Sequence, residues 1–175
     1  MKSIFERFTK RTLLFIIVIH FFFLGNAATY YVATNGNDNN AGTLASPWAT
    51  WQKGFNSIRA GDILYVRGGT YSTSGTSYGS AWFGVRASGS DGTVSDTIKV
   101  FAYPGEKPIL DCANMATRSG IHFGILLNGL DYWHIKGLTV KNATEYNSGG
   151  VYTIANGWNI SDCTHVVLDQ CTVTY

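Results

Sequence analysis

Apolar residues recur with a fixed interval in the last third of the chain. Asp131–Asn142, DYWHIKGLTVKN, overlies Thr164–Tyr175, THVVLDQCTVTY, when the sequence is shifted so that Asp131 falls on Thr164. The shift places apolar residues on apolar residues at Trp133/Val166, Ile135/Leu168, Leu138/Cys171 and Val140/Val173, and upstream at Ile125/Trp158, Leu127/Ile160 and Leu130/Cys163. A period in this range is typical of stacked structural repeats.

The spacing inside each copy indicates two short strands that meet at a corner. Apolar positions are two, then three, then two residues apart, so one extra residue interrupts strand alternation, Gly137 in one copy and Gln170 in the other. A hairpin can show such an interruption once. Its recurrence at the same phase predicts a chain that winds in similar turns, an all-β solenoid.

Further strands are expected upstream, where β-branched and aromatic residues cluster between turn formers. The expected strands are Thr29–Ala33, Ile63–Arg67, Trp82–Val85, Thr97–Tyr103 and Pro108–Asp111. Between them we expect a turn at Gly68–Tyr71 and a surface loop that continues to about Ser80.

One short helix is expected before the second strand. Ser46 and Pro47 have the character of an N-cap and a first helical residue. Trp48, Trp51, Phe55 and Ile58 follow at helical spacing. A helix with this apolar face would cover the open end of a solenoid. Tryptophans also stack on sugars, but core packing is the favoured interpretation.

The segment Thr34–Thr43, TNGNDNNAGT, is dense in turn-forming residues with side-chain oxygens. Its composition raises the question of a calcium loop. Asp38 is its one carboxylate, whereas sites for hard cations usually carry more negative charge. A solvated turn is therefore the preferred interpretation.

The segment Met1–Ala27 has the pattern of a secretory signal peptide. A basic segment precedes the apolar run Leu13–Leu24, and Gly25-Asn26-Ala27 supplies small residues at a cleavage point. The alternative is a membrane anchor, but the apolar run is shorter than the roughly 20 residues that span a bilayer. We expect residues 28–175 to form one secreted domain that does not associate with a membrane.

Charge gives no argument for a nucleic acid partner. The whole chain of 175 residues has 13 basic and 11 acidic residues, but Met1–Ala27 contains four of the bases and one of the acids, so nine bases and ten acids remain. The remainder is close to neutral, unlike a typical nucleic-acid-binding domain. Because the chain ends within the strand pattern CTVTY, we also expect it to be the N-terminal part of a longer protein.

Four segments together resemble the N-terminal part of the secreted pectate lyases of polysaccharide lyase family 9. They are YYVATNGNDNNAGT, SPWATWQKGFNSIRAGDILYVRGGTY, IKVFAYPGEKPILD and LDYWHIKGLTVKNA, and they span Tyr30 to Ala143. The resemblance implies a right-handed parallel β-helix with the pectin lyase fold, here with a short N-terminal capping helix.

The same resemblance implies an activity, the β-elimination of an acidic polysaccharide such as polygalacturonate. It also implies calcium in the complete protein, with a lysine as base. The family's catalytic residues and calcium ligands are expected beyond Tyr175, so none is transferred to this chain, which alone we expect to be inactive. Two alternatives stay open: a non-catalytic glycan-binding or structural β-helix, and a glycoside hydrolase on the same fold. A monomer is expected.

A few side chains remain as candidates for contact with substrate. Lys136 and Lys141 are expected to point outwards, and Glu145 follows in the adjacent turn, so the three are groove candidates. The competing interpretation is that they are solvated charges that keep the sheet soluble. His122, His134 and His165 lack metal-ligand spacing, and the three cysteines are expected to serve as small buried apolar residues.

Overall fold

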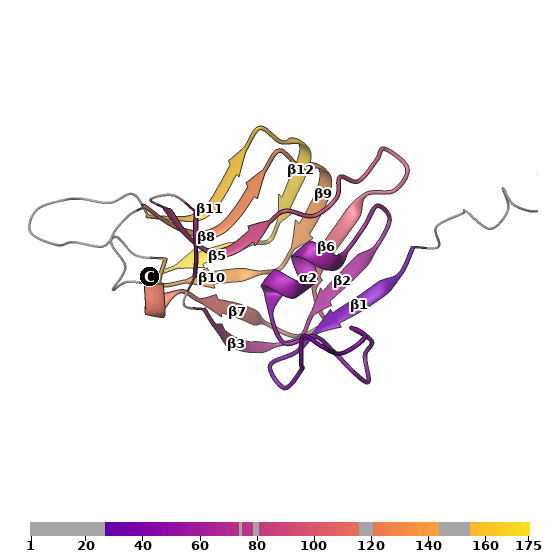
Figure 1. Cartoon of the computed structure of the whole chain (residues 1–175), viewed down its shortest axis with the longest axis horizontal. Coiled ribbons are helices and arrows are strands. Elements are labelled where there is room, and N and C mark those ends of the chain that lie inside the picture. The colour runs from indigo at the N-terminus through magenta and orange to yellow at the C-terminus, as the bar shows by residue number, and fades with distance from the viewer. Residues whose placement is uncertain (1–26, 74, 79–80, 116–120, 144–154) are drawn as a thin grey trace, which may run out of the picture.

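The computed structural model describes residues 27–73, 75–78, 81–115, 121–143 and 155–175. These residues form a β-solenoid of about four turns, with one α-helix (Figure 1). The strands are β1 (Thr29–Val32), β2 (Ile63–Val66), β3 (Gly69–Ser72), β4 (Thr76–Tyr78), β5 (Ala81–Ala87), β6 (Ile98–Ala102), β7 (Pro108–Asp111), β8 (Ile121–Asn128), β9 (Asp131–Lys136), β10 (Thr139–Lys141), β11 (Ala155–Ser161), β12 (Thr164–Asp169) and β13 (Thr172–Thr174). The helices are α2 (Trp51–Ser57) and a short 3-10 helix at Ala113–Met115.

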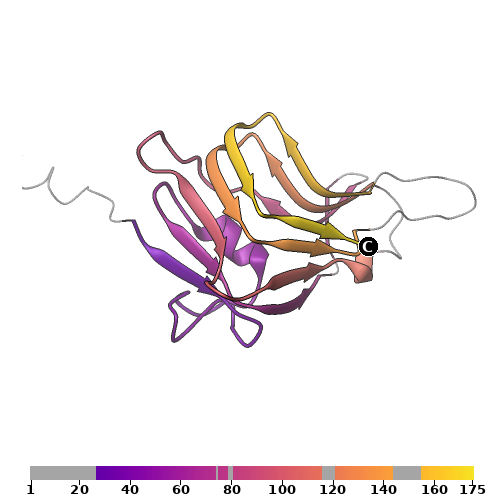
Figure 2. The ribbon, with the colours of Figure 1, turned by 180° about the vertical axis from the view of Figure 1, so that it is seen from behind.

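Three sheets run along the solenoid, and each turn contributes strands to them. The five-stranded sheet has the order β1-β2-β6-β9-β12, the β7/β10 sheet the order β13-β10-β7-β3, and the β5/β8 sheet the order β11-β8-β5-β4. Every pairing between these strands is parallel except β4 with β5. Seen from behind, successive turns lie beside one another in the same direction (Figure 2). The solenoid predicted from the sequence is therefore confirmed.

The strand register confirms the predicted repeat residue by residue. Trp133 pairs with Val166 and Ile135 with Leu168 in the five-stranded sheet. Val140 pairs with Val173 one corner later. The upstream matches hold as well, because Ile125 and Leu127 on β8 pair with Trp158 and Ile160 on β11.

The corners also repeat. Gly137 and Gln170, predicted to interrupt the strands, have φ values of 72° and 54°. A single left-handed residue turns the chain from β9 into β10 and from β12 into β13. The same conformation recurs at the matched pairs Gly129/Asp162 (63° and 54°) and Tyr132/His165 (57° and 54°).

Inward side chains form columns that continue from turn to turn. Leu64, Val100 and Ile135 are neighbours in register on three strands, and none is exposed to solvent. Leu168 is next in the column and is 38% exposed. Burial of such columns supplies most of the driving force for this fold, since each aliphatic side chain that is fully buried contributes about 1.5–3 kcal/mol.

A column of glycines brings two of the sheets close together. Gly84, Gly124 and Gly157 are neighbours in register on β5, β8 and β11. A Cβ on Gly124 would meet Val140 Cγ1 and the Gly157 carbonyl oxygen, and one on Gly84 would lie 2.6 Å from the Gly124 carbonyl oxygen. The absence of side chains is thus required for the β5/β8 sheet to approach the β7/β10 sheet.

The helix begins later than predicted. Its N-cap is Thr50, whose side chain accepts a hydrogen bond from the Lys53 amide, so Ser46 is not the N-cap and Pro47 is not helical. Trp48 is instead fixed by an isolated parallel bridge to Val32 and by its indole bond to the Asn40 carbonyl. The prediction that core packing explains the apolar face of the helix is confirmed, because Trp51 and Phe55 are buried and α2 packs against β1, β2 and β5.

Asp38 connects the turn-rich segment to this helix. One carboxylate oxygen accepts hydrogen bonds from the amides of Ala49 and Thr50, at 2.8 and 2.9 Å, and the other accepts from the Thr50 hydroxyl at 2.7 Å. The Thr34–Thr43 segment is therefore an ordered turn. Its Asp38 carboxylate, and not solvent, accepts the hydrogen bonds of the residues that directly precede α2.

Two other expectations need correction. The turn predicted at Gly68–Tyr71 is instead largely the strand β3 (Gly69–Ser72), because these residues pair with Pro108–Asp111 in the next turn of the solenoid. The expected surface loop contains β4, which folds back antiparallel on β5. The polar residues of both strands resemble loop composition, and pairing with neighbouring strands overrides that local preference.

We expect the substitution Gly124→Ala to lower the free energy of unfolding by about 1–3 kcal/mol, because the new methyl group meets the Gly157 backbone and Val140. Guanidinium unfolding followed by circular dichroism measures the change. The matched control is Gly157→Ala, because the three atoms nearest to its methyl group belong to the Val173 side chain, which is 38% exposed and can shift into solvent. Equal losses for the two variants would contradict this role of the glycine column.

Candidate functional site

Lys136 lies on the outer side of the five-stranded sheet and forms an ion pair with the next turn. Its ammonium group is 2.7 Å from Asp169 Oδ2, and the two residues are neighbours in register on β9 and β12. The bond from Lys136 holds the pKa of Asp169 below its usual value. The side chains of Lys136 and Asp169 are 43% and 33% exposed, so solvent screens the pair and its contribution to stability is small.

His134 completes this cluster but does not bond to it. Its Nε2 lies 3.8 Å from Asp169 Oδ2, too far for a hydrogen bond, and the atom is buried without a partner within the described residues. The ring meets Phe101 edge to face, with centroids 5.0 Å apart. His134 therefore packs within the sheet, opposite Val167 in the next turn.

The chemistry open to Lys136 follows from this geometry. The side chain of Lys136 is 43% exposed, and its ammonium group bonds to Asp169. Lys136 can therefore donate a further hydrogen bond to an anionic group that approaches from solvent.

Lys141 lies on the other side of the corner, on β10, so the two predicted groove lysines belong to different sheets. It is a register neighbour of Asp111 on β7. Burial by itself raises the pKa of Asp111. The net pKa is nevertheless lowered, because the carboxylate accepts hydrogen bonds from the Ala113 amide and the Asn142 side chain and lies near the Lys141 charge. Glu145, the third groove candidate, lies outside the described residues.

No metal site forms in the part of the chain that the structure describes. No three His, Cys, Asp or Glu side chains gather there. Asp38, the acidic residue of the turn-rich segment, is already occupied by two amides and a hydroxyl. Among the described residues, therefore, none fits the calcium that the resemblance implies.

The remaining histidines and the cysteines have structural positions. His122 is 1% exposed, and His165 stacks on Tyr132 with centroids 4.3 Å apart. Cys112 is fully buried, as predicted, and burial raises the pKa of its thiol to about 12. A thiol with this pKa is not a nucleophile at neutral pH. Cys163 and Cys171 are free thiols of intermediate burial.

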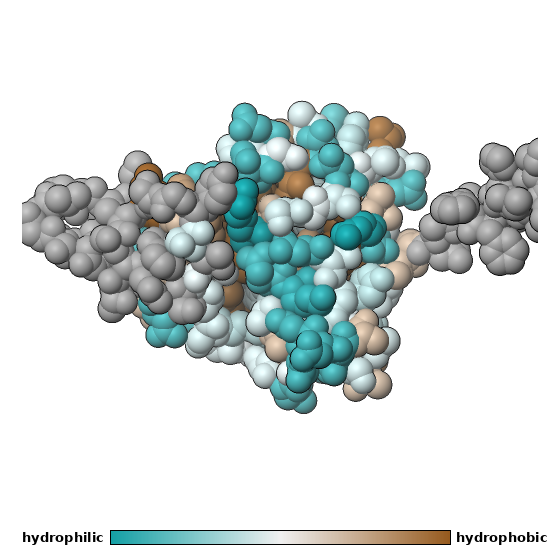
Figure 3. All heavy atoms as spheres, in the orientation of Figure 1, coloured by the Kyte–Doolittle hydropathy of each residue, from teal (hydrophilic) through white to brown (hydrophobic). Residues whose placement is uncertain are grey.

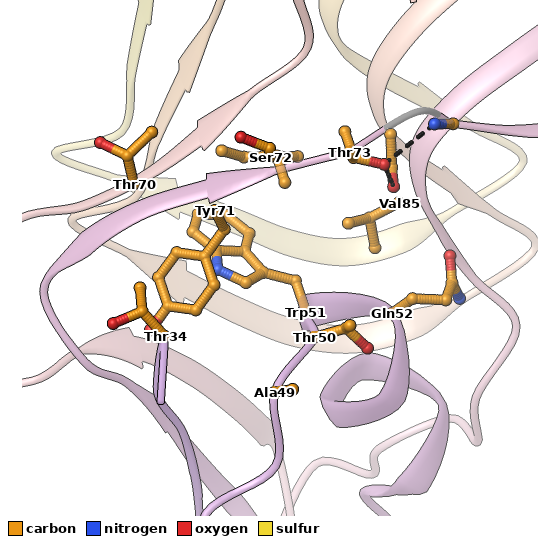
Figure 4. Close-up of a pocket in the computed structure, with 13 residues that line it drawn as sticks. Thr34, Ala49, Thr50, Trp51, Gln52, Thr70, Tyr71, Ser72, Thr73 and Val85 are labelled. Carbon is orange, nitrogen blue, oxygen red and sulfur yellow. Dashed lines mark hydrogen bonds between the residues drawn. The ribbon is translucent and has the colours of Figure 1, made fainter. Parts of the chain in front are cut away.

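An uncharged cavity of about 440 Å³ lies between the start of α2 and strand β3 (Figure 4). Trp51 and Tyr71 meet in its wall edge to face, with ring centroids 5.6 Å apart. Hydroxyl groups surround them, from Thr34, Thr50, Thr70, Ser72 and Thr73. The Tyr71 hydroxyl donates to the Arg67 carbonyl at 2.8 Å. With no charged lining residue, the cavity has no acid or base that works near neutral pH.

The surface over α2 is strongly polar. Hydrophilic side chains gather across the middle of the face in Figure 3, over the helix and the loops that precede it. Within the described residues, no helix is long and apolar enough to span a bilayer.

Sequence reasoning located Lys136 and Lys141 correctly on strands but missed two features. The cavity was missed because its lining comes from separate segments of the chain. A group of outward-facing tyrosines, Tyr31, Tyr65 and Tyr103, was missed because its members are far apart in the chain. The sequence did contain a signal for this group, since each tyrosine recurs at the same strand phase in a successive turn.

Known proteins share this framework. A family model described as "Pel9A-like, right handed beta helix region" matches residues 30–173. "Pectate lyase L" of Paenibacillus polymyxa is 37% identical over 126 residues, which cover 72% of this chain and 25% of that protein. "Pectate lyase PEL9" of Emericella nidulans is 30% identical over 125 residues, covering 66% of this chain and 28% of that protein. The chain thus spans about a quarter of the length of these relatives.

Solved structures agree on the fold. A rhamnogalacturonan lyase matches with a TM-score of 0.59 and 26% identity, over 66% of this chain and 29% of its own. A GH136 lacto-N-biosidase from Eubacterium ramulus matches with a TM-score of 0.57 over 99% of this chain and 31% of its own, at 15% identity, which supports the fold alone. Because the family model covers most of the sequence, this chain belongs to the Pel9A-like right-handed β-helix family.

Proposed function

We propose that the protein containing this chain degrades an acidic polysaccharide, polygalacturonate, by β-elimination. The similarity to a pectate lyase, 37% identical over 126 residues, carries the proposal. The solenoid supports it, because a stack of parallel strands presents its outward side chains in straight rows, to which an extended polymer can bind.

The reaction assigns distinct tasks to the protein. A base takes the proton at C5 of a uronate, the C4–O4 bond breaks, and a C4–C5 double bond forms. Positive charge beside the uronate carboxylate stabilises the negative charge that develops during proton removal. Lys136 and Lys141 have solvent-accessible side chains that suit the binding of such carboxylates. We propose that the base lies in turns beyond the described residues.

Calcium is part of this proposal for the whole protein only. The described residues form no site for it. We therefore assign no step of the reaction to calcium in this chain. The dependence of activity on calcium is to be measured on the protein expressed from its complete gene.

The protein expressed from its complete gene is expected to release unsaturated uronates from polygalacturonate, because β-elimination creates a double bond conjugated with the carboxylate. Ultraviolet absorbance follows this product, first with calcium and then with a chelator. A calcium-dependent rise supports the lyase. New reducing ends without new absorbance would indicate a hydrolase and contradict β-elimination.

A second function, non-catalytic glycan binding, follows from one observation. One row across the outer side of the five-stranded sheet carries the aromatic residues Tyr31, Tyr65 and Phe101 and the basic residue Lys136. A folded protein that binds polygalacturonate without changing its absorbance or its reducing ends would support this second function.

We expect Lys136→Gln and Lys141→Gln each to raise KM for polygalacturonate by up to about fivefold, with little change in kcat, because an exposed charge contributes roughly 0–1 kcal/mol. Initial rates at several substrate concentrations separate the two constants. Lys53→Gln is the matched control, because Lys53 lies on α2 and not on a strand. An unchanged KM for both groove variants would show that these lysines are solvated charges only.

We also propose that the protein is secreted, with the signal segment removed after Ala27. Residues 1–26 lie outside the described part, and Ala28 is fixed by a 2.8 Å bond from its amide to Asp62 Oδ1. Mass spectrometry of the protein from the culture medium is expected to find Ala28 as the first residue. A product that keeps the apolar run Leu13–Leu24 would contradict cleavage.

A further inference from the structure

Three tyrosines from separate strands form a cluster on the outer side of the five-stranded sheet. Tyr31 on β1 is the register neighbour of Tyr65 on β2, and their rings stack with centroids 5.8 Å apart. Tyr103 follows β6 and contacts both rings, at 6.3 Å from Tyr31 and 5.7 Å from Tyr65. We call Tyr31, Tyr65, Tyr103 and the adjacent Arg67 the tyrosine face.

Strand alternation directs these rings away from the core. Val32, Leu64 and Val66 are 0% exposed and form the inner side of the same strands. The three tyrosines lie between or beside them and are half-buried. Within the described residues, their hydroxyl groups have no hydrogen-bond partner. Each ring therefore combines apolar surface with a polar group that is open to a ligand.

Arg67 adds a hydrogen-bond donor to this surface. Its guanidinium carbon lies 4.5 Å from the centre of the Tyr103 ring. Nε and Nη2 bond to the carboxylate of Glu106, at 2.7–3.1 Å, which leaves Nη1 without a partner in the described part of the chain. The ion pair is close to neutral overall, but it presents donors and acceptors in a fixed plane.

A cleft of about 460 Å³ adjoins the rings at this arginine. Thr34, Asn35, Arg67, Gly68 and Glu106 line it together with Ala33. Its volume lies within the range of small-ligand sites, roughly 300–1,000 Å³. The tyrosine face thus offers flat aromatic surface on one side and amide, hydroxyl and guanidinium groups on the other.

We propose that the tyrosine face and this cleft form a saccharide-binding site. A pyranose ring has an apolar C–H face and a rim of hydroxyl groups, which complement the tyrosine rings and the polar cleft. The sugar stacks on the Tyr65 ring and meets the Tyr103 ring, which stands at 75° to it, and Arg67 Nη1 donates to one of the sugar's oxygen atoms. The site lies on the first turns of the solenoid and holds the polymer without taking part in its cleavage, so it does not depend on the proposed reaction.

The rings also pair across strands, which by itself stabilises a sheet. A test must therefore separate binding from stability. Isothermal titration of the protein from its complete gene measures binding of trigalacturonate, with chelator present, and of the neutral sugar galactotriose. Tyr65→Ala is expected to weaken binding by about tenfold, the typical effect of losing one stacked ring, while Tyr65→Phe keeps affinity within about threefold.

Phe123→Ala is the matched control, because it removes a half-exposed aromatic ring from the β5/β8 sheet, where it stacks on Phe83. Thermal unfolding checks that each variant is folded. Affinity that falls equally in the control and in Tyr65→Ala, or in neither, would overturn the proposal. Arg67→Lys then distinguishes the ligands: a loss for trigalacturonate alone places a carboxylate at Nη1, and an equal loss for both sugars places a hydroxyl there.

A second measurement needs no variant and decides the question if Tyr65→Ala does not fold. Tetranitromethane nitrates accessible tyrosines, and peptide mass spectrometry locates the products. Bound sugar is expected to protect Tyr65 and Tyr103 but not Tyr132, whose ring stacks on His165 elsewhere. Equal nitration with and without sugar would refute the site. Protection without any lyase activity would leave the site standing and reject only the proposed reaction.

Discussion

The in-register stacking of parallel strands is the constraint on which the rest of this structure depends. Each turn must return to its starting point with its apolar residues at the same phase, because a shift by one residue would turn the buried side outwards. A single left-handed residue at the corner between β9 and β10, repeated between β12 and β13, makes that return possible. Leu64, Val100 and Ile135 can then form one buried column although they are far apart in the chain.

The same constraint determines what the outer surface can do. Residues at one strand phase form rows, and the row that starts with Tyr31 and Tyr65 continues through Phe101 to Lys136. Aromatic rings at one end and a lysine–aspartate pair at the other thus lie along one line of the five-stranded sheet. The register thus brings side chains from four separate turns into one row.

This explains which features the sequence could predict. The repeat, the corner glycine and the inward positions were predictable, because each leaves a local signal that recurs one turn later. The helix start was wrong because Trp48 fits a helical spacing, yet its backbone pairs with Val32. The strand β3 was missed because Gly69 and Thr70 have turn character, and only β7 in the next turn makes them a strand.

The candidate site was less predictable than the fold, for the same physical reason. Lys136 was correctly expected to face outwards, but its bond to Asp169 depends on the strand register of the following turn. The tyrosines of the tyrosine face recur at the same strand phase on successive turns, but their wide separation in the chain means that only the fold shows the contacts between their rings. The number of residues per turn also varies along the chain. It is larger between Ile63 and its partner Lys99 than between Trp133 and its partner Val166. Only the folded register therefore brings such residues together.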